Sequence, residues 1–136
     1  KRHASANWQG TGKEGKGHLT TQSTVLNKTQ YSFGSRFEEG VGTNPEELVA
    51  AAHAGCFTMK VAFLVNAKGA TAESLNTTCE ITMENGAISA SHLSMKAKVP
   101  GISQADFDAV VQEAYVNCMV TKLFNLTTTC EAVLEA

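Results

Sequence analysis

The chain has 136 residues, and 11 lysines and arginines against 13 aspartates and glutamates give it a formal net charge of −2. This balance argues against a nucleic-acid partner, since no basic stripe interleaved with aromatic residues is present. The length favours a single domain over 1–136, with a hydrophobic core large enough to fold without disulfide bonds or a structural metal. Its four cysteines are too few for a disulfide scaffold, which favours an intracellular, reducing compartment.

The first part of the chain is expected to form a meander of three short strands. Residues 3–9 and 18–26 alternate loosely and flank a glycine-rich turn at 10–17. The alternation continues through 30–37, because aromatic side chains fall on odd positions there. This segment is therefore predicted as a third strand that ends at Arg36.

A long helix is expected to begin at Pro45. Asn44 can cap it, and proline suits the first helical position because its missing N–H would be unpaired there anyway. Glu46 and Glu47 then lie favourably in the first turn. We expect the helix to extend to about Lys68.

The middle of this helix, 49–65, is apolar on nearly all faces, which is typical of a buried central helix. Gly69 is its expected end. The apolar run is interrupted by His53 and Lys60, so we expect no membrane span. A single domain of this size cannot surround such a helix completely, which suggests a partner subunit.

The second half of the chain is expected to contain a β-hairpin, an amphipathic helix, a short helical turn and a last strand. An asparagine–glycine pair between the hairpin strands is typical of a tight turn, and the helix has an apolar stripe with a 3.6-residue period. The expected ranges are 72–84 and 87–99 for the hairpin, 103–118 for the helix, 121–124 for the helical turn and 126–134 for the strand. The order βββ-α-ββ-α-β predicts an α+β fold with an antiparallel sheet around the long helix.

Cys56 lies deep inside the long helix, where it is either an inert core residue or a reactive thiol. Reactivity requires the thiolate, whereas apolar surroundings raise the pKa of a thiol. The helix dipole helps only within the first turn, so a cation must come from elsewhere in the fold. Arg36 is the candidate because a guanidinium stays charged when buried. Its burial would need a carboxylate, which Glu46 or Glu47 could supply.

Two polar neighbours, His53 and Lys60, share a helical face with Cys56. A cysteine–histidine pair could be a catalytic dyad or part of a metal site, but the sequence places no third ligand. We therefore expect His53 to lie in a helix-packing seam, Lys60 to reach solvent, and the protein to need no metal or cofactor.

The other cysteines lie far from Cys56 in the sequence. Cys118 comes at the end of the amphipathic helix and could trap a sulfenic acid formed on Cys56, since sulfenic acids condense readily with a nearby thiol. Cys79 and Cys130 fall in alternating, threonine-rich strand segments and are interpreted as small fillers.

The run from Gly42 to Met59, GTNPEELVAAAHAGCFTM, closely resembles the osmotically inducible protein and organic hydroperoxide resistance (OsmC/Ohr) family. The resemblance extends over nearly the whole chain, from Asn7-Trp8 to the second cysteine at a helix end. The Glu-Glu pair and the histidine before the first cysteine are similar to the OsmC branch. The resemblance implies a bacterial, cytoplasmic, thiol-dependent peroxidase that works as an intertwined homodimer with active sites at the interface.

The resemblance also implies roles by motif position. Cys56 would be the peroxidatic thiol and Cys118 the resolving thiol, with Arg36 activating Cys56 and Glu46 orienting Arg36 from across the dimer interface. The implied substrates are organic hydroperoxides and hydrogen peroxide, and the implied reductant is a dithiol such as dihydrolipoamide. Met119 stands where the family usually has proline.

Two other function classes remain open from the sequence. One is a cysteine hydrolase or transferase that uses Cys56 with His53. The other is a dimeric stress-response binding module that keeps the fold but has inert thiols.

Overall fold

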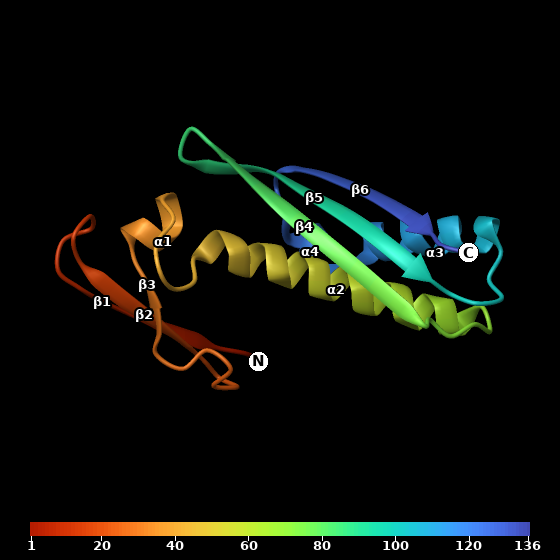
Figure 1. Cartoon of the computed structure of the whole chain (residues 1–136), viewed down its shortest axis with the longest axis horizontal. Coiled ribbons are helices and arrows are strands. Elements are labelled where there is room, and N and C mark those ends of the chain that lie inside the picture. The colour runs from red at the N-terminus through yellow and green to blue at the C-terminus, as the bar shows by residue number, and fades with distance from the viewer. The chain divides into compact units, whose positions relative to one another are not determined.

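The computed structural model describes the whole chain, residues 1–136, as two compact units, Lys1–Leu48 and Val49–Ala136. Each unit contains a small three-stranded sheet (Figure 1). The elements are β1 (Ala4–Gln9), β2 (Lys16–Thr21), β3 (Thr29–Tyr31), α1 (Phe33–Phe37), α2 (Pro45–Ala67), β4 (Ser74–Glu84), β5 (Ala87–Lys98), α3 (Gln104–Asn117), α4 (Met119–Leu123) and β6 (Thr127–Leu134). This order confirms the α+β class.

The first unit contains the expected three-stranded meander. β2 lies between β1 and β3 and is antiparallel to both. Gly17 in β2 pairs with Trp8 on one side and Tyr31 on the other. A Cβ at Gly17 would overlap both rings, so glycine is needed for the two aromatic side chains to meet edge to face across the sheet, with centroids 5.4 Å apart.

The prediction that the third strand continues through Arg36 is wrong, because the strand ends at Tyr31 and a short helix, α1, follows. Ser32 and Ser35 cap this helix reciprocally. The Ser35 N–H donates to the Ser32 Oγ at 3.2 Å, and the Ser32 N–H donates to the Ser35 Oγ at 2.7 Å. This local capping outweighs the aromatic alternation and places Arg36 in the last turn of a helix.

The second unit is built on the sheet β4-β5-β6. The β4–β5 hairpin forms as expected, with Asn85 (φ 53°) and Gly86 (φ 76°) both in the left-handed region that a type I′ turn requires. β6, however, runs parallel to β5. The expectation of a purely antiparallel sheet is therefore wrong at this edge, since α3 and α4 form the long crossover that parallel neighbours need.

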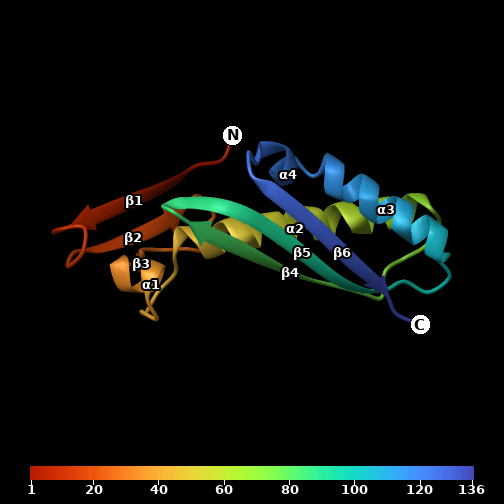
Figure 2. The same ribbon diagram turned by 90° about the horizontal axis from the view of Figure 1, so that it is seen from above.

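The core of the second unit lies on one face of this sheet. Alternate residues of β5 are buried, and side chains from α2 and α3 pack against them, so the two helices lie on the same side of the sheet (Figure 2). The largest fully buried apolar side chains are Phe57, Val61 and Val65 of α2, Leu93 and Met95 of β5, and Phe107 and Val110 of α3.

The start and end of α2 follow the predicted signals. The Glu47 N–H donates to the Asn44 Oδ1 at 2.8 Å, and Gly69 takes a positive φ of 83° just after the helix. The burial of α2 differs from the expectation, because within one chain only one face is covered. Met59 is 62% and Phe63 68% exposed.

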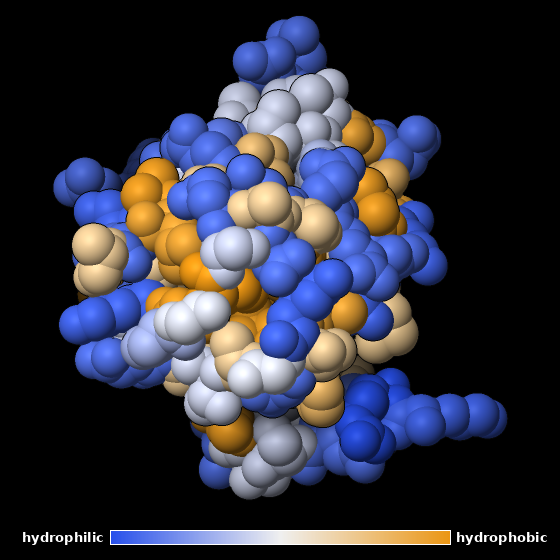
Figure 3. All heavy atoms as spheres, turned by 90° about the vertical axis from the view of Figure 1, so that its right-hand side faces the viewer, coloured by the Kyte–Doolittle hydropathy of each residue, from blue (hydrophilic) through white to orange (hydrophobic).

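The uncovered apolar surface is substantial. By length and composition alone α2 could cross a bilayer, with 23 residues, a mean hydropathy of 1.7 over its best 18-residue window and 22% of that window buried. Figure 3, which views the right-hand side of Figure 1, shows hydrophobic residues exposed among hydrophilic ones on that face. An exposed apolar face of this kind is typical of a surface that binds another molecule.

Candidate active site

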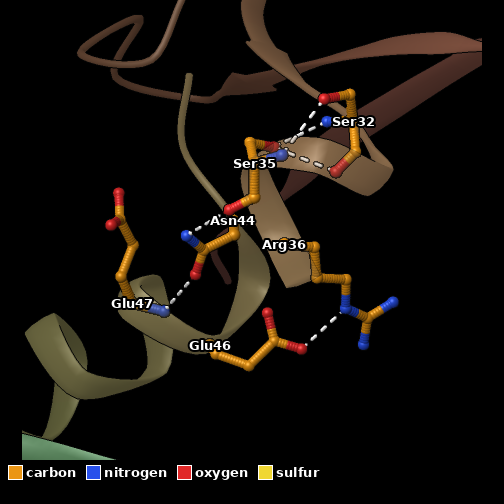
Figure 4. A network of polar contacts seen from close by, with 6 residues as sticks. All are labelled: Ser32, Ser35, Arg36, Asn44, Glu46 and Glu47. Atoms are coloured by element: carbon orange, nitrogen blue, oxygen red, sulfur yellow. Dashed lines mark hydrogen bonds and ion pairs between the residues drawn. The ribbon is translucent and has the colours of Figure 1, made fainter. Parts of the chain in front are cut away.

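The structure pairs Arg36 with Glu46. The Arg36 Nε donates to the Glu46 Oε1 at 2.7 Å (Figure 4). Both residues lie in the unit Lys1–Leu48, and the pair forms within one chain. The Asn44 amide donates to the Ser35 carbonyl at 2.9 Å, which ties the start of α2 to α1. The orientation of Arg36 is thus set by two helix termini that are hydrogen-bonded to each other.

The pair leaves hydrogen-bonding capacity unused on both sides. Only the Nε of Arg36 is engaged, and its terminal nitrogens point away from Glu46 (Figure 4). The guanidinium stacks over the Phe37 ring at 5.1 Å, and the side chain remains 45% exposed. On the other side, Glu46 is buried and its Oε2 has no partner. Arg36 can therefore offer donors to an anion while Glu46 holds it.

Cys56 and Cys118 are the second pair, and both belong to the unit Val49–Ala136. Cys118 lies at the junction where α3 ends and α4 begins. It is buried, with 1% exposure, whereas Cys56 is only partly buried, and both thiols are free. The two thiols lie close enough for each to influence the ionisation of the other. Cys56 is therefore the thiol that a small molecule can reach first.

The two thiols differ in acidity. Burial raises the pKa of Cys56, the neighbouring Cys118 thiol raises it further, and the backbone at Val120 only partly offsets this. Burial also acts to raise the pKa of Cys118, but the polar groups of the nearby Cys56 and Thr121 lower it overall. Within its own unit Cys56 is thus a poor thiolate, and a nucleophilic Cys56 needs a cation.

His53 is fully buried and engages both ring nitrogens. Its Nδ1 lies 2.7 Å from the Ser91 Oγ and its Nε2 lies 2.8 Å from the Thr121 Oγ1, while the Phe124 ring packs edge-on at 4.9 Å. Burial lowers the pKa of His53, which favours the neutral imidazole. No ring nitrogen remains to act as a base for Cys56, which argues against the dyad of a hydrolase.

The remaining cysteines are embedded in strands. Burial raises the pKa of Cys79, and it raises that of Cys130 to about 11. Cys79 also contacts the Ser91 hydroxyl at 3.2 Å. Neither thiol is acidic enough to compete as a nucleophile near neutral pH. No group of three or more His, Cys, Asp or Glu side chains could hold a metal ion.

The predicted site residues thus form two pairs, one in each unit: Arg36–Glu46 and Cys56–Cys118. Sequence reasoning missed the polar partners of His53, which are Ser91 and Thr121. For Thr121 a signal was available, because it follows Cys118 by three residues, the spacing of an N-cap and its N3 position.

Comparisons with known proteins agree on one family. A family model described as OsmC-like protein matches residues 38–132. The chain is 38% identical over 135 residues to Peroxiredoxin OsmC of Escherichia coli (strain K12), covering 96% of this chain and 94% of the relative. Among solved structures, an OsmC-like protein of unknown function from Vibrio cholerae has a TM-score of 0.75 at 15% identity, covering 98% of this chain and 99% of that one. The organic hydroperoxide resistance protein OhrB of Bacillus subtilis has a TM-score of 0.65 at 18% identity, covering 98% of each chain.

Proposed function

The chain belongs to the OsmC-like protein family, and on that premise we propose that it is a thiol-dependent peroxidase for organic hydroperoxides and hydrogen peroxide. The relative in Escherichia coli is named a peroxiredoxin, and the neighbour in Bacillus subtilis is named for organic hydroperoxide resistance. The observation that carries the proposal is the proximity of the Cys56 and Cys118 thiols, of which the first is partly exposed and the second is buried.

In the first step the Cys56 thiolate attacks the peroxide O–O bond. The sulfur takes the terminal oxygen and becomes a sulfenic acid, the O–O bond breaks, and the alkoxide takes a proton to leave as an alcohol. The terminal nitrogens of Arg36 would stabilise the Cys56 thiolate and the charge that develops on the departing oxygen. Glu46 would hold the guanidinium through its Nε, which leaves those nitrogens free for the task.

In the second step Cys118 attacks the sulfur of the sulfenic acid. A disulfide between Cys56 and Cys118 forms, and the oxygen leaves as water together with the Cys118 proton. A dithiol of the dihydrolipoamide type would then regenerate both thiols by thiol–disulfide exchange, being oxidised itself to its disulfide.

We further infer that the working protein is a homodimer. The exposed face of α2, with Met59 and Phe63, would be covered by a second copy. The orphaned, buried Oε2 of Glu46 also points to a missing hydrogen-bond donor, because an unpaired buried carboxylate oxygen is costly. A second subunit could supply both.

Mass spectrometry after one equivalent of an organic hydroperoxide tests the proposal. We expect a Cys56–Cys118 disulfide in the wild type, a stable or over-oxidised Cys56 in Cys118→Ser, and no peroxide consumption in Cys56→Ser. Cys130→Ser is the matched control and should behave like the wild type. Four unmodified thiols, or peroxide consumption that survives Cys56→Ser, would refute the peroxidase proposal, and the first outcome would favour a binding module.

A further inference from the structure

We propose that Asn44 is a positioning residue for Arg36, because its side-chain amide fastens the helical turn that carries Arg36 to the start of the helix that carries Glu46. The catalytic consequence of this arrangement rests on the peroxidase function proposed above, whereas the contacts themselves do not. All of these contacts lie in the unit Lys1–Leu48.

Asn44 makes two hydrogen bonds, one with each end of its side-chain amide (Figure 4). Its Oδ1 accepts the Glu47 N–H at 2.8 Å and so caps α2. Its Nδ2 donates at 2.9 Å to the carbonyl of Ser35, the residue directly before Arg36. One side chain therefore starts α2 and also holds α1.

α1 needs support from outside the helix. It spans only five residues, and a helix of little more than one turn is not stable by itself. The carbonyls of its last turn have no helical N–H to bind. The Gly34 carbonyl is bound by two backbone N–H groups of the following loop, at 2.9 and 3.0 Å, whereas the Ser35 carbonyl accepts the Asn44 amide. The backbone just before Arg36 is thus held by a side chain of the next element.

The loop between α1 and α2 fixes where Asn44 lies. A Cβ on Gly40 would come within 2.5 Å of the Gly34 carbonyl carbon, so the loop packs directly against α1. Pro45 restricts Asn44 to an extended backbone, which is the conformation that an N-cap residue needs. A substitution of the Asn44 side chain should therefore leave the backbone at this position in place.

The same network determines which glutamate binds Arg36. The Glu47 carboxylate accepts the Thr43 hydroxyl at 2.8 Å and points away from Arg36 (Figure 4). Glu46, which is buried, accepts the Arg36 Nε at 2.7 Å. Arg36 is otherwise restrained by the Phe37 ring, and its side chain is 45% exposed. A shift of α1 relative to the start of α2 would therefore separate Arg36 from Glu46, and the bridge between the two helices opposes that shift.

The first test compares Asn44→Ser with Asn44→Ala. Serine caps a helix as well as asparagine does, but its side chain is too short to donate to the Ser35 carbonyl, whereas alanine loses both contacts. The readout is hydrogen exchange of the Arg36 Nε–H, followed by nitrogen NMR. The chain has one other arginine, Arg2, whose Nε makes no hydrogen bond and which serves as the internal reference. We expect the Arg36 Nε–H to exchange about three- to tenfold faster in Asn44→Ser than in the wild type, since one hydrogen bond of average strength is lost.

Ser103→Ala is the matched control for the loss of a helix cap, because Ser103 caps α3 by accepting the Asp106 N–H at 3.1 Å. This variant should lower the urea midpoint but leave the Arg36 Nε–H protected. Equal exchange of the Arg36 Nε–H in the wild type and in Asn44→Ser would overturn the proposal. These measurements use no peroxide, so failure of the proposed peroxidase function would not change their result.

The second test measures the rate of Cys56 oxidation by a hydroperoxide in stopped flow. Asn44→Ser should slow it about three- to tenfold in the wild-type background and change nothing further in Arg36→Ala, because the bridge acts only through Arg36. An equal loss in both backgrounds would mean that Asn44 supports the fold in general, and would overturn the positioning role.

A measurement on the unaltered protein decides the question if the Asn44 variants fail to fold. The side-chain amide protons of Asn44 should include one that exchanges more slowly than those of Asn85, which lies exposed in the β4–β5 turn. Equally fast exchange of the two side-chain amides would refute the bridge to Ser35 and, with it, the proposal.

Discussion

Oxidation of Cys56 and Cys118 to a disulfide should stabilise the folded chain, because the bond would close a long loop in the unfolded chain. The loop contains about 60 residues, for which the chain-entropy relation gives about 14 cal/mol/K, or about 4 kcal/mol at room temperature. The two thiols already lie near each other in the reduced protein. Bond formation therefore needs little movement of α2 against the α3–α4 junction, and most of this stabilisation should be realised.

Urea unfolding of the reduced and the oxidised protein measures this difference. With a typical slope of about 2 kcal/mol per molar for a chain of this size, 4 kcal/mol corresponds to a midpoint shift of about 2 M. Both forms must be compared at one protein concentration, because the proposed dimer makes stability concentration-dependent. Cys118→Ser treated with the same peroxide should show no shift, and Cys130→Ser should shift like the wild type.

An unchanged midpoint, in a sample in which mass spectrometry shows the Cys56–Cys118 bond, would refute the loop-closure reasoning. It would mean that the bond strains the junction of α3 and α4 by as much as it constrains the unfolded chain. A sample that forms no such bond would instead remove Cys118 from the mechanism.

Three further outcomes are expected. Arg36→Ala should lower the rate of Cys56 oxidation on the order of 100-fold, since a charge-stabilising donor is lost, and Arg36→Lys should fall between it and the wild type in stopped-flow peroxide kinetics. Phe63→Asp on the exposed face of α2 should convert the proposed dimer to a monomer in light scattering, whereas Val25→Asp, at a site 85% exposed in a turn, should not. Because burial raises the pKa of Cys130 to about 11, its neutral thiol is favoured in the fold and stability should decline as pH rises from about 9 toward 11. Cys130→Ala should weaken that decline in unfolding experiments.

Local signals in the sequence predicted most of the fold. The start of α2 at Asn44 and the turn at Asn85 depend on neighbours within a few residues, and both formed as expected. The family resemblance, which rested on a capped helix start followed at a fixed distance by Cys56, is confirmed. The helix α1 was missed although its signal was local, because a serine pair three residues apart was outweighed by the aromatic alternation around it.

Sequence periodicity did not predict the contacts between residues that are far apart in the chain. The parallel pairing of β6 with β5 depends on where the α3–α4 crossover returns the chain, which no local pattern records. The partners of His53 come from β5 and α4, 38 and 68 residues away in sequence. A histidine at this point was expected in a helix-packing seam, and the structure adds two hydroxyl groups there, those of Ser91 and Thr121, which hydrogen-bond to the ring.

Cys56 and the exposed apolar surface belong to one helix, α2, so the position of the thiol and the apolar composition of the helix have a common explanation. α2 carries Cys56 on a partly buried face, next to the core formed by Phe57 and Val61, and leaves Met59 and Phe63 exposed. Because successive helical residues point in different directions, a helix that must present a thiol between two packed surfaces has to be apolar almost all round. The composition that makes α2 long and apolar enough for a membrane is therefore also the composition that the proposed thiol site at a dimer interface would require. On this reasoning, disrupting the seam at Phe63 should slow peroxide turnover as well as separate the subunits, although Phe63 contributes no reacting atom.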